Sequence, residues 1–457
     1  MPVRAPLIAG VPPARIAALA EWEAATYAAA RPKCRAALAA GAGAWLDGVP
    51  MHWMRDWPQP FPMVVAKARD AKIEDLDGNV LDDFCLGDTG AMFGHSPAPV
   101  AKAIRHQARR GLTTMLPGED ALAVGVLLQE RFGPMLWQIA TTATDANRFA
   151  LRVARAVTGR PKVLVFSGCY HGTVDEAMVQ LAGGQTVPRP GLVGQAADLT
   201  QTAVAVEFND LTAVEEALKA GDIAAVLAEP VMTNACMVLP EPGFHEALRR
   251  LASDYGALLI LDETHTQSSG LGGYTRRHGL QPDMFVVGKC IAGGIPAAAW
   301  GMSAEVAERL HRYHQTRPPG HSGMGTTLSA NPMQFAALRA TLAEVMTPKA
   351  FARMEDGAAK LEAGLAKAIA HHGAPWHVVR VGARVEFICH PTPLRNGTEA
   401  AAAHHPALEA AIHAALLNRG CLIAPFHNMM LVSPVTSGKQ IARLIAAFEA
   451  VLAELFA

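Results

Sequence analysis

The spacing of hydrophobic and polar positions changes near Pro97. Before it, Lys72–Leu76 and Val80–Phe84 flank Asp77-Gly78, a dipeptide that accommodates the positive φ of a tight turn, so the pattern predicts a hairpin. After it, short runs that are apolar on both faces alternate with stretches of helical periodicity, which predicts a parallel sheet covered by helices. The runs are Lys162–Phe166, Ala203–Phe208, Ile223–Ala228, Ala257–Leu261 and Met284–Val287.

Amphipathic helices are expected around these runs. Gly243–Tyr255 carries one apolar stripe and is stopped by Gly256. Beyond Asn331-Pro332 the pattern predicts a long helix, a short strand at Arg384–Ile388 and a closing helix at Gln440–Leu455. The Ala- and Arg-rich stretch Ala5–Ala42 is expected to form one amphipathic helix.

The expected fold class is α/β with a second, smaller lobe. Residues 97–332 are predicted to form a large domain with a mainly parallel sheet. Residues 1–96 and 333–457 are predicted to supply a small α+β domain built from both termini. With 457 residues, 51% of them hydrophobic, the chain is long enough to bury the cores of two lobes.

Composition and charge exclude several classes of protein. Lys and Arg number 40 against 41 Asp and Glu, so the net charge of −1 provides no basic footprint for nucleic acid. No apolar run reaches the roughly 18–20 residues of a membrane span, and the N-terminus lacks a signal-peptide pattern. We expect a cytoplasmic protein whose partners are a small molecule or another copy of the chain.

Cysteine and histidine patterns argue against metal sites and disulfides. The seven cysteines are scattered without a C-x-x-C pair, so reduced thiols are expected. The pairs His371-His372 and His404-His405 occur in polar stretches without a zinc-binding motif. Both pairs are expected in solvated loops, and no metal site is predicted.

Polar residues follow two of the predicted strands. Leu258–Leu261 is followed by Asp262-Glu263, and Met284–Val287 is followed by Gly288-Lys289. Because ligands bind at the carboxyl ends of parallel strands, an acid and a lysine are expected at the same edge. Pyridoxal phosphate chemistry requires this pair, a nucleophilic amine and a carboxylate that keeps a pyridine nitrogen protonated. On these two features alone, a structural ion pair is an equal alternative.

Nucleotide-binding motifs are missing from the sequence. No G-x-G-x-x-G follows the first predicted strand, and no G-x-x-x-x-G-K-[ST] occurs anywhere. A dinucleotide-dependent enzyme and a P-loop NTPase are therefore disfavoured.

Six further segments occur in a fixed order along the chain. They are Gly87–His95, Thr142–Ala146, Ser167–Gly172, Glu229–Asn234, Asp262–His265 and Gly325–Pro332. In this order they resemble the motifs of the class III aminotransferases, and within them the branch typified by glutamate-1-semialdehyde aminomutase. The resemblance runs from the Asp77-Gly78 hairpin to the end of the chain. It implies the fold type I of pyridoxal phosphate enzymes and pyridoxal 5'-phosphate as cofactor.

The resemblance also implies roles for individual residues. Lys289 would bind the cofactor as a Schiff base and carry the proton, and Asp262 would face the pyridine nitrogen. Ala143 and Thr144 would bind the phosphate at the start of a helix expected at Asp145–Val157, where an ordinary Thr N-cap is the alternative. The remaining cofactor residues would be Tyr170 stacked on the ring with His171 beside it, and Thr264 on the other face. Glu229 would lie near the hydroxyl side, and Asn234 near the phenolic oxygen or the substrate. Thr327 would reach the phosphate of the neighbouring subunit, which implies a homodimer with shared active sites.

Several positions depart from the family pattern. Ala143 replaces a Gly, Asp145 a Glu and Thr264 a Val, and none of these changes removes an essential chemical group. The segment Gly48–Arg55 lacks the Ser/Arg pattern with which the aminomutase holds its substrate. The aminomutase substrate is therefore not supported.

Three residues are candidates for substrate binding. Arg384 and Arg55 could bind a substrate carboxylate, because guanidinium geometry suits a carboxylate better than an ammonium does. An exposed position on an edge strand is the alternative for these arginines. Asp88 could meet a cationic group, although a cap of the Gly-rich turn is the preferred interpretation of Asp88.

The predicted function is transfer of an amino group from an amino acid or amine to a keto acid or aldehyde. One alternative is another reaction on the same cofactor, namely that of an aminomutase, racemase or decarboxylase. A second alternative is a non-catalytic α/β binding protein in which Lys289 is structural.

Overall fold

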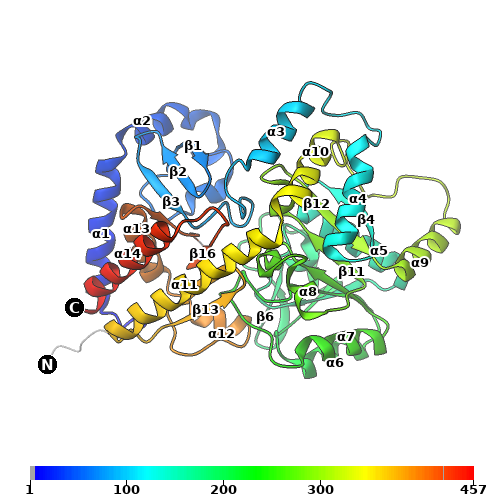
Figure 1. Ribbon diagram of the computed structural model, residues 1–457. Helices are drawn as coiled ribbons and strands as arrows, with labels where there is room; N and C mark the ends of the chain where they lie inside the picture. The colour runs from blue at the N-terminus through cyan, green and yellow to red at the C-terminus, as the bar shows by residue number, and fades with distance from the viewer. Residues whose placement is uncertain (1–5, 426) are drawn as a thin grey trace. The chain divides into compact units, whose positions relative to one another are not determined.

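The computed structural model describes residues 6–425 and 427–457 (Figure 1). The chain divides into two compact units. The first contains the described chain up to Ser96, together with Lys349–Pro393 and Ala403–Ala457. The second contains Pro97–Pro348 and Leu394–Ala402. The first unit is therefore assembled from both ends of the chain.

A seven-stranded sheet forms the centre of the second unit, with the order β4-β12-β11-β10-β9-β5-β8. β10 is parallel to β9 and β11, and β5 is parallel to β9 and β8. β12 runs antiparallel to β11 and β4. The strands are β4 (Leu136–Ala140), β5 (Lys162–Phe166), β8 (Ala203–Val206), β9 (Ile223–Ala228), β10 (Leu258–Asp262), β11 (Met284–Val287) and β12 (Ala298–Met302). The predicted α/β fold with a mainly parallel sheet is confirmed.

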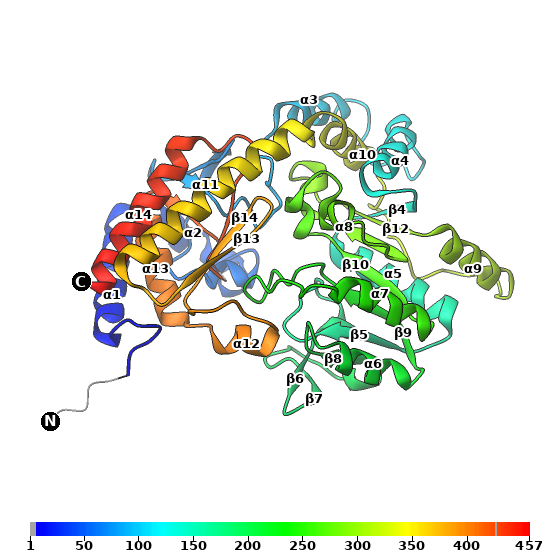
Figure 2. The ribbon, with the colours of Figure 1, turned by 60° about the horizontal axis from the view of Figure 1, so that its bottom comes forward.

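Helices cover this sheet because its central strands are apolar on both faces. Every residue of β9, β10 and β11 is buried. Helix α5 packs against β4, β9, β10, β11 and β12, and α7 packs against β10 and α6 (Figure 2). The helices are α3 (Ala98–Gln107), α4 (Glu119–Phe132), α5 (Ala143–Thr158), α6 (Leu211–Lys219), α7 (Phe244–Asp254), α8 (Gly273–His278), α9 (Ala304–Gln315), α10 (Pro332–Ala340) and α12 (Gly397–Ala402).

The second unit differs from the expected large domain at two places. It extends beyond residue 332 because α10 packs against α3 and α4. It also takes in Leu394–Ala402, where the Gly397 amide donates to Glu207 Oε2 at 3.1 Å. A separate hairpin of β6 (Val179–Ala182) and β7 (Gln185–Pro188) was not predicted.

The long helix predicted beyond Pro332 is present as α11 (Pro348–His372), and the shorter α10 precedes it as a separate helix. A π-helical turn at Thr341–Val345 lies between them, with the Met346 amide donating to Thr341 O. Pro348 then starts α11, and a proline cannot donate the backbone hydrogen bond that would continue the earlier helix.

Two small sheets and five helices make up the first unit within the described residues. The sheets have the orders β1-β2-β3-β15 and β13-β14-β16. Their strands are β1 (Val65–Arg69), β2 (Lys72–Asp75), β3 (Val80–Asp83), β13 (His377–Val381), β14 (Arg384–Ile388), β15 (Cys421–Leu422) and β16 (Met429–Leu431). The helices are α1 (Pro13–Ala30), α2 (Pro32–Gly41), α11, α13 (Pro406–Asn418) and α14 (Gly438–Phe456). The predicted hairpin is confirmed as β2 and β3, with Gly78 at φ +90° in the turn.

The N-terminal stretch forms two helices rather than the single helix that was expected. α1 ends at Ala30 and α2 begins at Pro32, because the residue before a proline is displaced from helical geometry, here Arg31 at φ −132° and ψ 52°. The predicted start at Ala5 lies outside the described residues. Among the described helices, none combines the length and apolarity needed to cross a membrane.

Candidate active site

The carboxyl ends of four neighbouring parallel strands lie at one edge of the large sheet, and each is followed or ended by an ionisable residue. Asp262 ends β10, and Lys289 follows β11. Glu229 follows β9, and His171 lies in the loop after β5. Because β5, β9, β10 and β11 are adjacent and parallel, these side chains lie at the same edge.

Asp262 is held by three hydrogen bonds and is only 4% exposed. Its Oδ2 contacts His171 Nδ1 at 3.0 Å and accepts from Asn147 Nδ2 at 2.8 Å. Its Oδ1 accepts from the Thr264 amide at 3.1 Å. The carboxylate is therefore fixed in orientation by three different segments of the chain.

Asp262 and His171 stabilise each other in their charged forms. Burial raises the pKa of Asp262, but the His171 hydrogen bond and charge, with the bonds from Thr264 and Asn147, lower it to about 2. Burial lowers the pKa of His171, but Cys169 and the Asp262 carboxylate raise it to about 10. Asp262 is therefore an anion at neutral pH.

Lys289 has an uncommon backbone conformation. Its φ is +50°, in the left-handed region that costs a non-glycine residue about 1–3 kcal/mol. It opens the short helix Lys289–Ala292 after Gly288. A Cβ atom at Gly288 would lie 3.0 Å from Ala143 Cβ, so Gly288 lets the lysine segment approach the start of α5.

The amine of Lys289 ends a chain of hydrogen bonds. Nζ contacts His265 Nε2, and His265 Nδ1 lies 2.9 Å from Thr233 Oγ1. Thr233 Oγ1 donates to Glu229 Oε2 at 2.5 Å, and Asn234 Nδ2 donates to Glu229 Oε1 at 3.2 Å. Burial raises the pKa of Glu229 above its usual value, although the His171 charge and the Thr233 hydrogen bond oppose this.

The N-terminus of α5 lies beside these groups. Thr142 caps the helix, and its Oγ1 accepts from the Asp145 amide at 3.1 Å. Ala143 and Thr144 form the first turn, whose free N–H groups and dipole favour an anion. Thr144 Oγ1 accepts from the Thr173 amide at 3.2 Å, which ties this turn to the His171 loop.

Three further predicted cofactor residues occupy different environments. Tyr170 lies in the loop after β5 and is 42% exposed. Thr264 is buried beside Asp262, and its Oγ1 has no hydrogen-bond partner among the described residues. Thr327 lies in an exposed turn before α10. The structure thus brings Thr264 to the Asp262 cluster, while Thr327 faces outward from its chain.

The candidate substrate residues all belong to the first unit. Arg384 lies on β14, the central strand between β13 and β16, and is 0% exposed. Its Nη2 donates to Thr89 Oγ1. The alternative that places Arg384 at an exposed edge-strand position is therefore wrong, because the strand is paired on both sides. Arg55 is exposed on a short helix and forms an ion pair with Asp47 at 3.1 Å.

Asp83 caps the loop after the hairpin. Asp83 Oδ1 accepts from the amides of Cys85 and Leu86, both at 2.8 Å. Asp88 lies near enough to His427 for its charge to act on the imidazole. Burial lowers the pKa of His427, but the charges of Glu386 and Asp88 raise it above its usual value. The capping role of Asp88 stays a prediction from the sequence.

Sequence reasoning gave no role to Asn147, His265 and Thr233. Asn147 is fully buried on the face of α5 that carries Ala150, Leu151 and Ala154. A polar residue within such an apolar face was the available signal. For His265, the signal was the polar run directly after an apolar strand, in which residues 263–269 are all buried.

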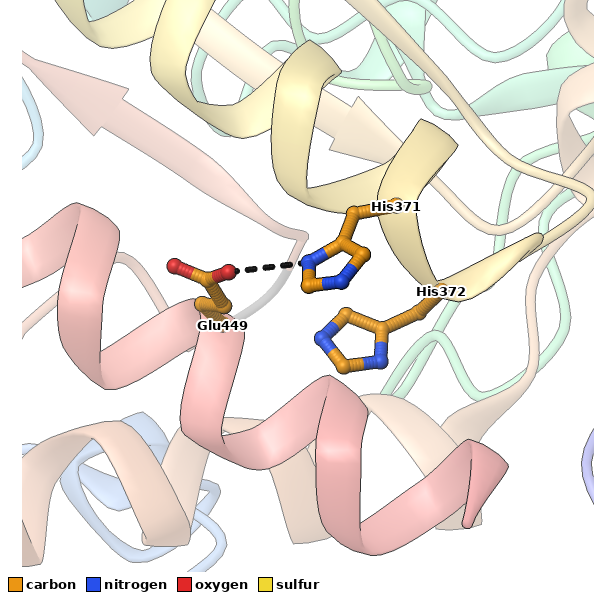
Figure 3. A group of neighbouring side chains, drawn as sticks. All are labelled: His371, His372 and Glu449. Carbon is orange, nitrogen blue, oxygen red and sulfur yellow. Dashed lines mark hydrogen bonds and ion pairs between the residues drawn. The ribbon is translucent and has the colours of Figure 1, made fainter.

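The expected solvated loop at His371-His372 is wrong. Both residues lie at the end of α11, and His371 Nδ1 is 3.1 Å from Glu449 Oε1 of α14 (Figure 3). His371 is 67% exposed, so the group is explained as a surface ion pair between two helices of the first unit. His404-His405 does lie in a loop, where His404 pairs with Glu409.

The groups at the sheet edge match one cofactor in charge and chemistry. An amine suits an aldehyde, an ionised carboxylate suits a basic ring nitrogen, and a helix N-terminus suits a phosphate. The unpartnered Thr264 hydroxyl adds a buried polar atom for a ligand to contact. Pyridoxal phosphate carries all three of these groups, and the fold with this edge defines the fold type I class of pyridoxal phosphate enzymes.

Comparisons with known proteins establish the family. The family described as "Aminotransferase class-III" matches residues 53–452, so the chain belongs to the class III aminotransferases. Its cofactor is pyridoxal 5'-phosphate. A protein of Bacillus anthracis named glutamate-1-semialdehyde 2,1-aminomutase 2 is 34% identical over 405 residues, which cover 86% of this chain and 91% of the relative.

Solved structures agree with this membership. One from Pseudomonas aeruginosa PAO1, titled a glutamate-1-semialdehyde-aminomutase, has a TM-score of 0.96 and 48% identity over 98% of this chain and 100% of its own. A lysine-to-alanine variant under the same name is described in complex with PMP. An omega-transaminase from Sphaerobacter thermophilus has a TM-score of 0.85 and 28% identity over 94% of this chain and 99% of its own.

Proposed function

We propose that the protein is an aminotransferase that moves an amino group from an amino acid or amine to a keto acid or aldehyde. The observation that carries the proposal is the lysine amine of Lys289 at the same sheet edge as the ionised, triply hydrogen-bonded Asp262. When bound, the cofactor supplies a ring that accepts electrons from the substrate carbon. The protein supplies orientation and charge.

Asp262 would hold the proton on the ring nitrogen of the cofactor. A carboxylate whose pKa is about 2 stays ionised and stabilises that positive nitrogen. His171 and Asn147 act through Asp262, because their hydrogen bonds fix its Oδ2. Its charge and its orientation are therefore both set before the substrate arrives.

The remaining assignments place the cofactor. The α5 amides at Ala143 and Thr144 would bind the phosphate, while Tyr170 and Thr264 would cover the two faces of the ring. Glu229 and Asn234 would lie near its hydroxyl side. Lys289 Nζ would take a proton from the substrate carbon and return it at the C4' atom of the cofactor, as general base and then general acid.

A homodimer with shared sites is part of the proposal. Thr327 is exposed and would contact the phosphate in the neighbouring subunit. Exposed apolar residues of the second unit, including Leu122 at 78% and Val126 at 57% on one face of α4, support burial against a second copy. A cytoplasmic location without nucleic-acid partners stays a prediction from the sequence.

The second candidate function is an aminomutase. The names of the relatives at 34% and 48% identity favour it. By its name, such an enzyme moves an amino group between carbons 2 and 1 of one molecule, so no separate acceptor is needed. The sequence of Gly48–Arg55 and the omega-transaminase similarity support transfer between two molecules instead.

A product assay distinguishes the two functions. The purified holoenzyme is incubated with a panel of amino donors, with pyruvate or 2-oxoglutarate as acceptor, and keto products are measured by chromatography. In parallel it is given glutamate-1-semialdehyde alone. The proposal expects acceptor-dependent keto product, which Lys289→Ala abolishes. Isomerisation of glutamate-1-semialdehyde without any acceptor-dependent product would contradict it.

A further inference from the structure

Lys289 is connected to Glu229 through His265 and Thr233. The donor and the acceptor of each hydrogen bond along this path can be assigned. The Thr233 hydroxyl has a single proton, and it donates that proton to Glu229 Oε2 at 2.5 Å. Towards His265 Nδ1, 2.9 Å away, the same oxygen must therefore accept. Nδ1 then carries the hydrogen of a neutral His265, and Nε2 presents its lone pair.

That lone pair faces the amine of Lys289. His265 Nε2 contacts Lys289 Nζ, and an ammonium or amine has only hydrogens to offer to such an acceptor. His265, Thr233 and Glu229 are all buried, so water does not compete freely for these bonds. These contacts form a hydrogen-bonded path from the half-buried Lys289 amine to a buried carboxylate.

We propose that His265, Thr233 and Glu229 form a proton relay that takes the proton from the Lys289 ammonium and so sets the nucleophilic, neutral state of its amine. The inference deepens the proposed function and rests on it, because that function needs Lys289 as a nucleophile and base. His265 contacts the reacting nitrogen and is a catalytic residue in this sense. Thr233 and Glu229 act through it as positioning residues.

The proton step balances along the relay. Lys289 Nζ loses one proton to His265 Nε2, and His265 releases its Nδ1 proton to Thr233 Oγ1. Thr233 passes its own hydroxyl proton to Glu229 Oε2. At the end Lys289 is neutral, Glu229 is a carboxylic acid, and His265 remains neutral in its other tautomer. Burial raises the pKa of Glu229, which suits a group that stores the proton.

Other charges around the relay are accounted for. The Asp262–His171 pair acts on Glu229 from β10 and the loop after β5, and its two charges oppose each other there. Glu263, the neighbour of Asp262, is satisfied by the Thr266 hydroxyl and by the amides of Tyr274 and Thr275. The path from Lys289 to the Glu229 carboxylate therefore runs through His265 and Thr233.

The relay is tested on the protein without cofactor, by the reactivity of Lys289 itself. Acetic anhydride acetylates only neutral amines, and peptide mass spectrometry gives the rate at each lysine as a function of pH. Lys162, which pairs with Asp222 at 2.9 Å, serves as the internal reference lysine. We expect His265→Gln, which keeps a polar contact but cannot carry the proton, to slow acetylation of Lys289 about tenfold near neutral pH.

Matched variants separate the relay from a packing effect. Thr233→Val removes only the hydroxyl and should shift the Lys289 profile in the same direction, whereas Thr233→Ser should restore it. His245→Gln is the control, because His245 is also buried in the second unit but bonds the Pro230 carbonyl. The double variant Thr233→Val/His265→Gln should shift the Lys289 acetylation profile little more than either single variant does, since both substitutions interrupt the same path.

The outcomes of this test and of the product assay are independent. An unchanged Lys289 profile in both His265→Gln and Thr233→Val overturns the relay, whatever the enzyme catalyses. A shifted profile in a protein without acceptor-dependent product supports the relay and contradicts the proposed function. If His265→Gln does not fold, Thr233→Val with its Ser rescue still decides the question.

Discussion

Asp262 and His171 show how one residue pair creates the charge that the cofactor needs. Each group alone would resist ionisation inside the sheet edge, because burial raises the pKa of an acid and lowers that of a histidine. Together, at 3.0 Å, they ionise each other. Removing one partner of a buried pair costs about 3–5 kcal/mol, so the pair matters for folding as well as for chemistry.

The pH dependence of this stabilisation follows from the two shifts. The folded pKa of Asp262, about 2, lies below its unfolded value, so its contribution is present above about pH 4 and is lost as the pH falls. The folded pKa of His171, about 10, lies above its unfolded value, so its contribution is full below about pH 6.5 and is lost as the pH rises.

We therefore predict that Asp262→Asn lowers the thermal unfolding midpoint most between about pH 4 and 6.5. The gap to the wild-type protein should narrow steadily above that range, and it is measured by calorimetry of the cofactor-free protein. The same variant should lose amino transfer by orders of magnitude. A gap that stays constant to about pH 9 would show that the pair is not ionised as described.

Arg384 supports a second prediction at this scale. Arg384→Ala should raise the Michaelis constant for carboxylate-bearing donors much more than for simple amines, because only the former present an anion. The measurement is the ratio of the Michaelis constants for the two donor types, since a loss of folded protein affects both donors equally. An unchanged ratio would leave Arg384 with a structural role on β14 and favour a simple amine as substrate.

Individual residues also show where sequence reasoning succeeds and where it stops. The position of Asp262 and Lys289 at one sheet edge was predictable, because apolar runs precede both residues and the carboxyl ends of parallel strands share an edge. Asn147 and His265 were not assigned, because their partners are distant in sequence, Asp262 at 115 positions and Lys289 at 24. Such a contact depends on the order of the strands in the sheet, and the periodicity of the sequence alone does not determine this order.

At the scale of elements, the start of α5 and the loop after β5 meet more closely than most side chains allow. Gly172 has φ +78°, and a Cβ there would lie 2.1 Å from Thr144 Oγ1. The loop that carries His171 is therefore packed directly against the predicted phosphate turn. A glycine at this position satisfies both the backbone conformation and the close approach.

Gly172→Ala should destabilise the protein and weaken cofactor retention, because the added methyl displaces the α5 turn. The matched control is Gly184→Ala, with φ +76° and no heavy atom within 4 Å of the added Cβ. Both variants carry the same backbone strain, so the difference in unfolding free energy, expected at about 1–3 kcal/mol, isolates the contact. Equal stability and equal cofactor absorbance after dialysis would refute this packing role.

Elements differ in how well their sequence specifies them. The strands Lys162–Phe166 and Ile223–Ala228 were predicted with their observed bounds, because continuous apolar runs between polar residues have few other uses. β12 was missed, since Ala298–Met302 lies close behind the glycines at 293 and 294, and its burial on both faces leaves no alternation of apolar and polar residues. The break between α10 and α11 depends on a π-helical turn that has no sequence rule of comparable strength.

At the scale of the whole molecule, the predicted cofactor residues gather in one of the two units. The second unit supplies Lys289, Asp262, His171 and the α5 turn. Among the predicted cofactor residues, only Thr327 is assigned to the site of the neighbouring subunit. Thr327 lies in an exposed turn of the second unit. Its assignment to a neighbouring subunit is thus the step on which the proposed dimer depends.

Mixing inactive variants tests that step. If Lys289 and Thr327 of one site come from different chains, a Lys289→Ala chain mixed with a Thr327→Ala chain forms heterodimers with one fully equipped site. Random exchange should then restore about a quarter of wild-type activity. The control mixes Lys289→Ala with Asp262→Asn, whose residues lie at the same sheet edge of one chain, and should restore none. Native mass spectrometry verifies that heterodimers form in both mixtures.

Recovery of activity in neither mixture would place the Thr327 contact within its own chain. Recovery in both mixtures would mean that the sheet edge itself is shared between subunits.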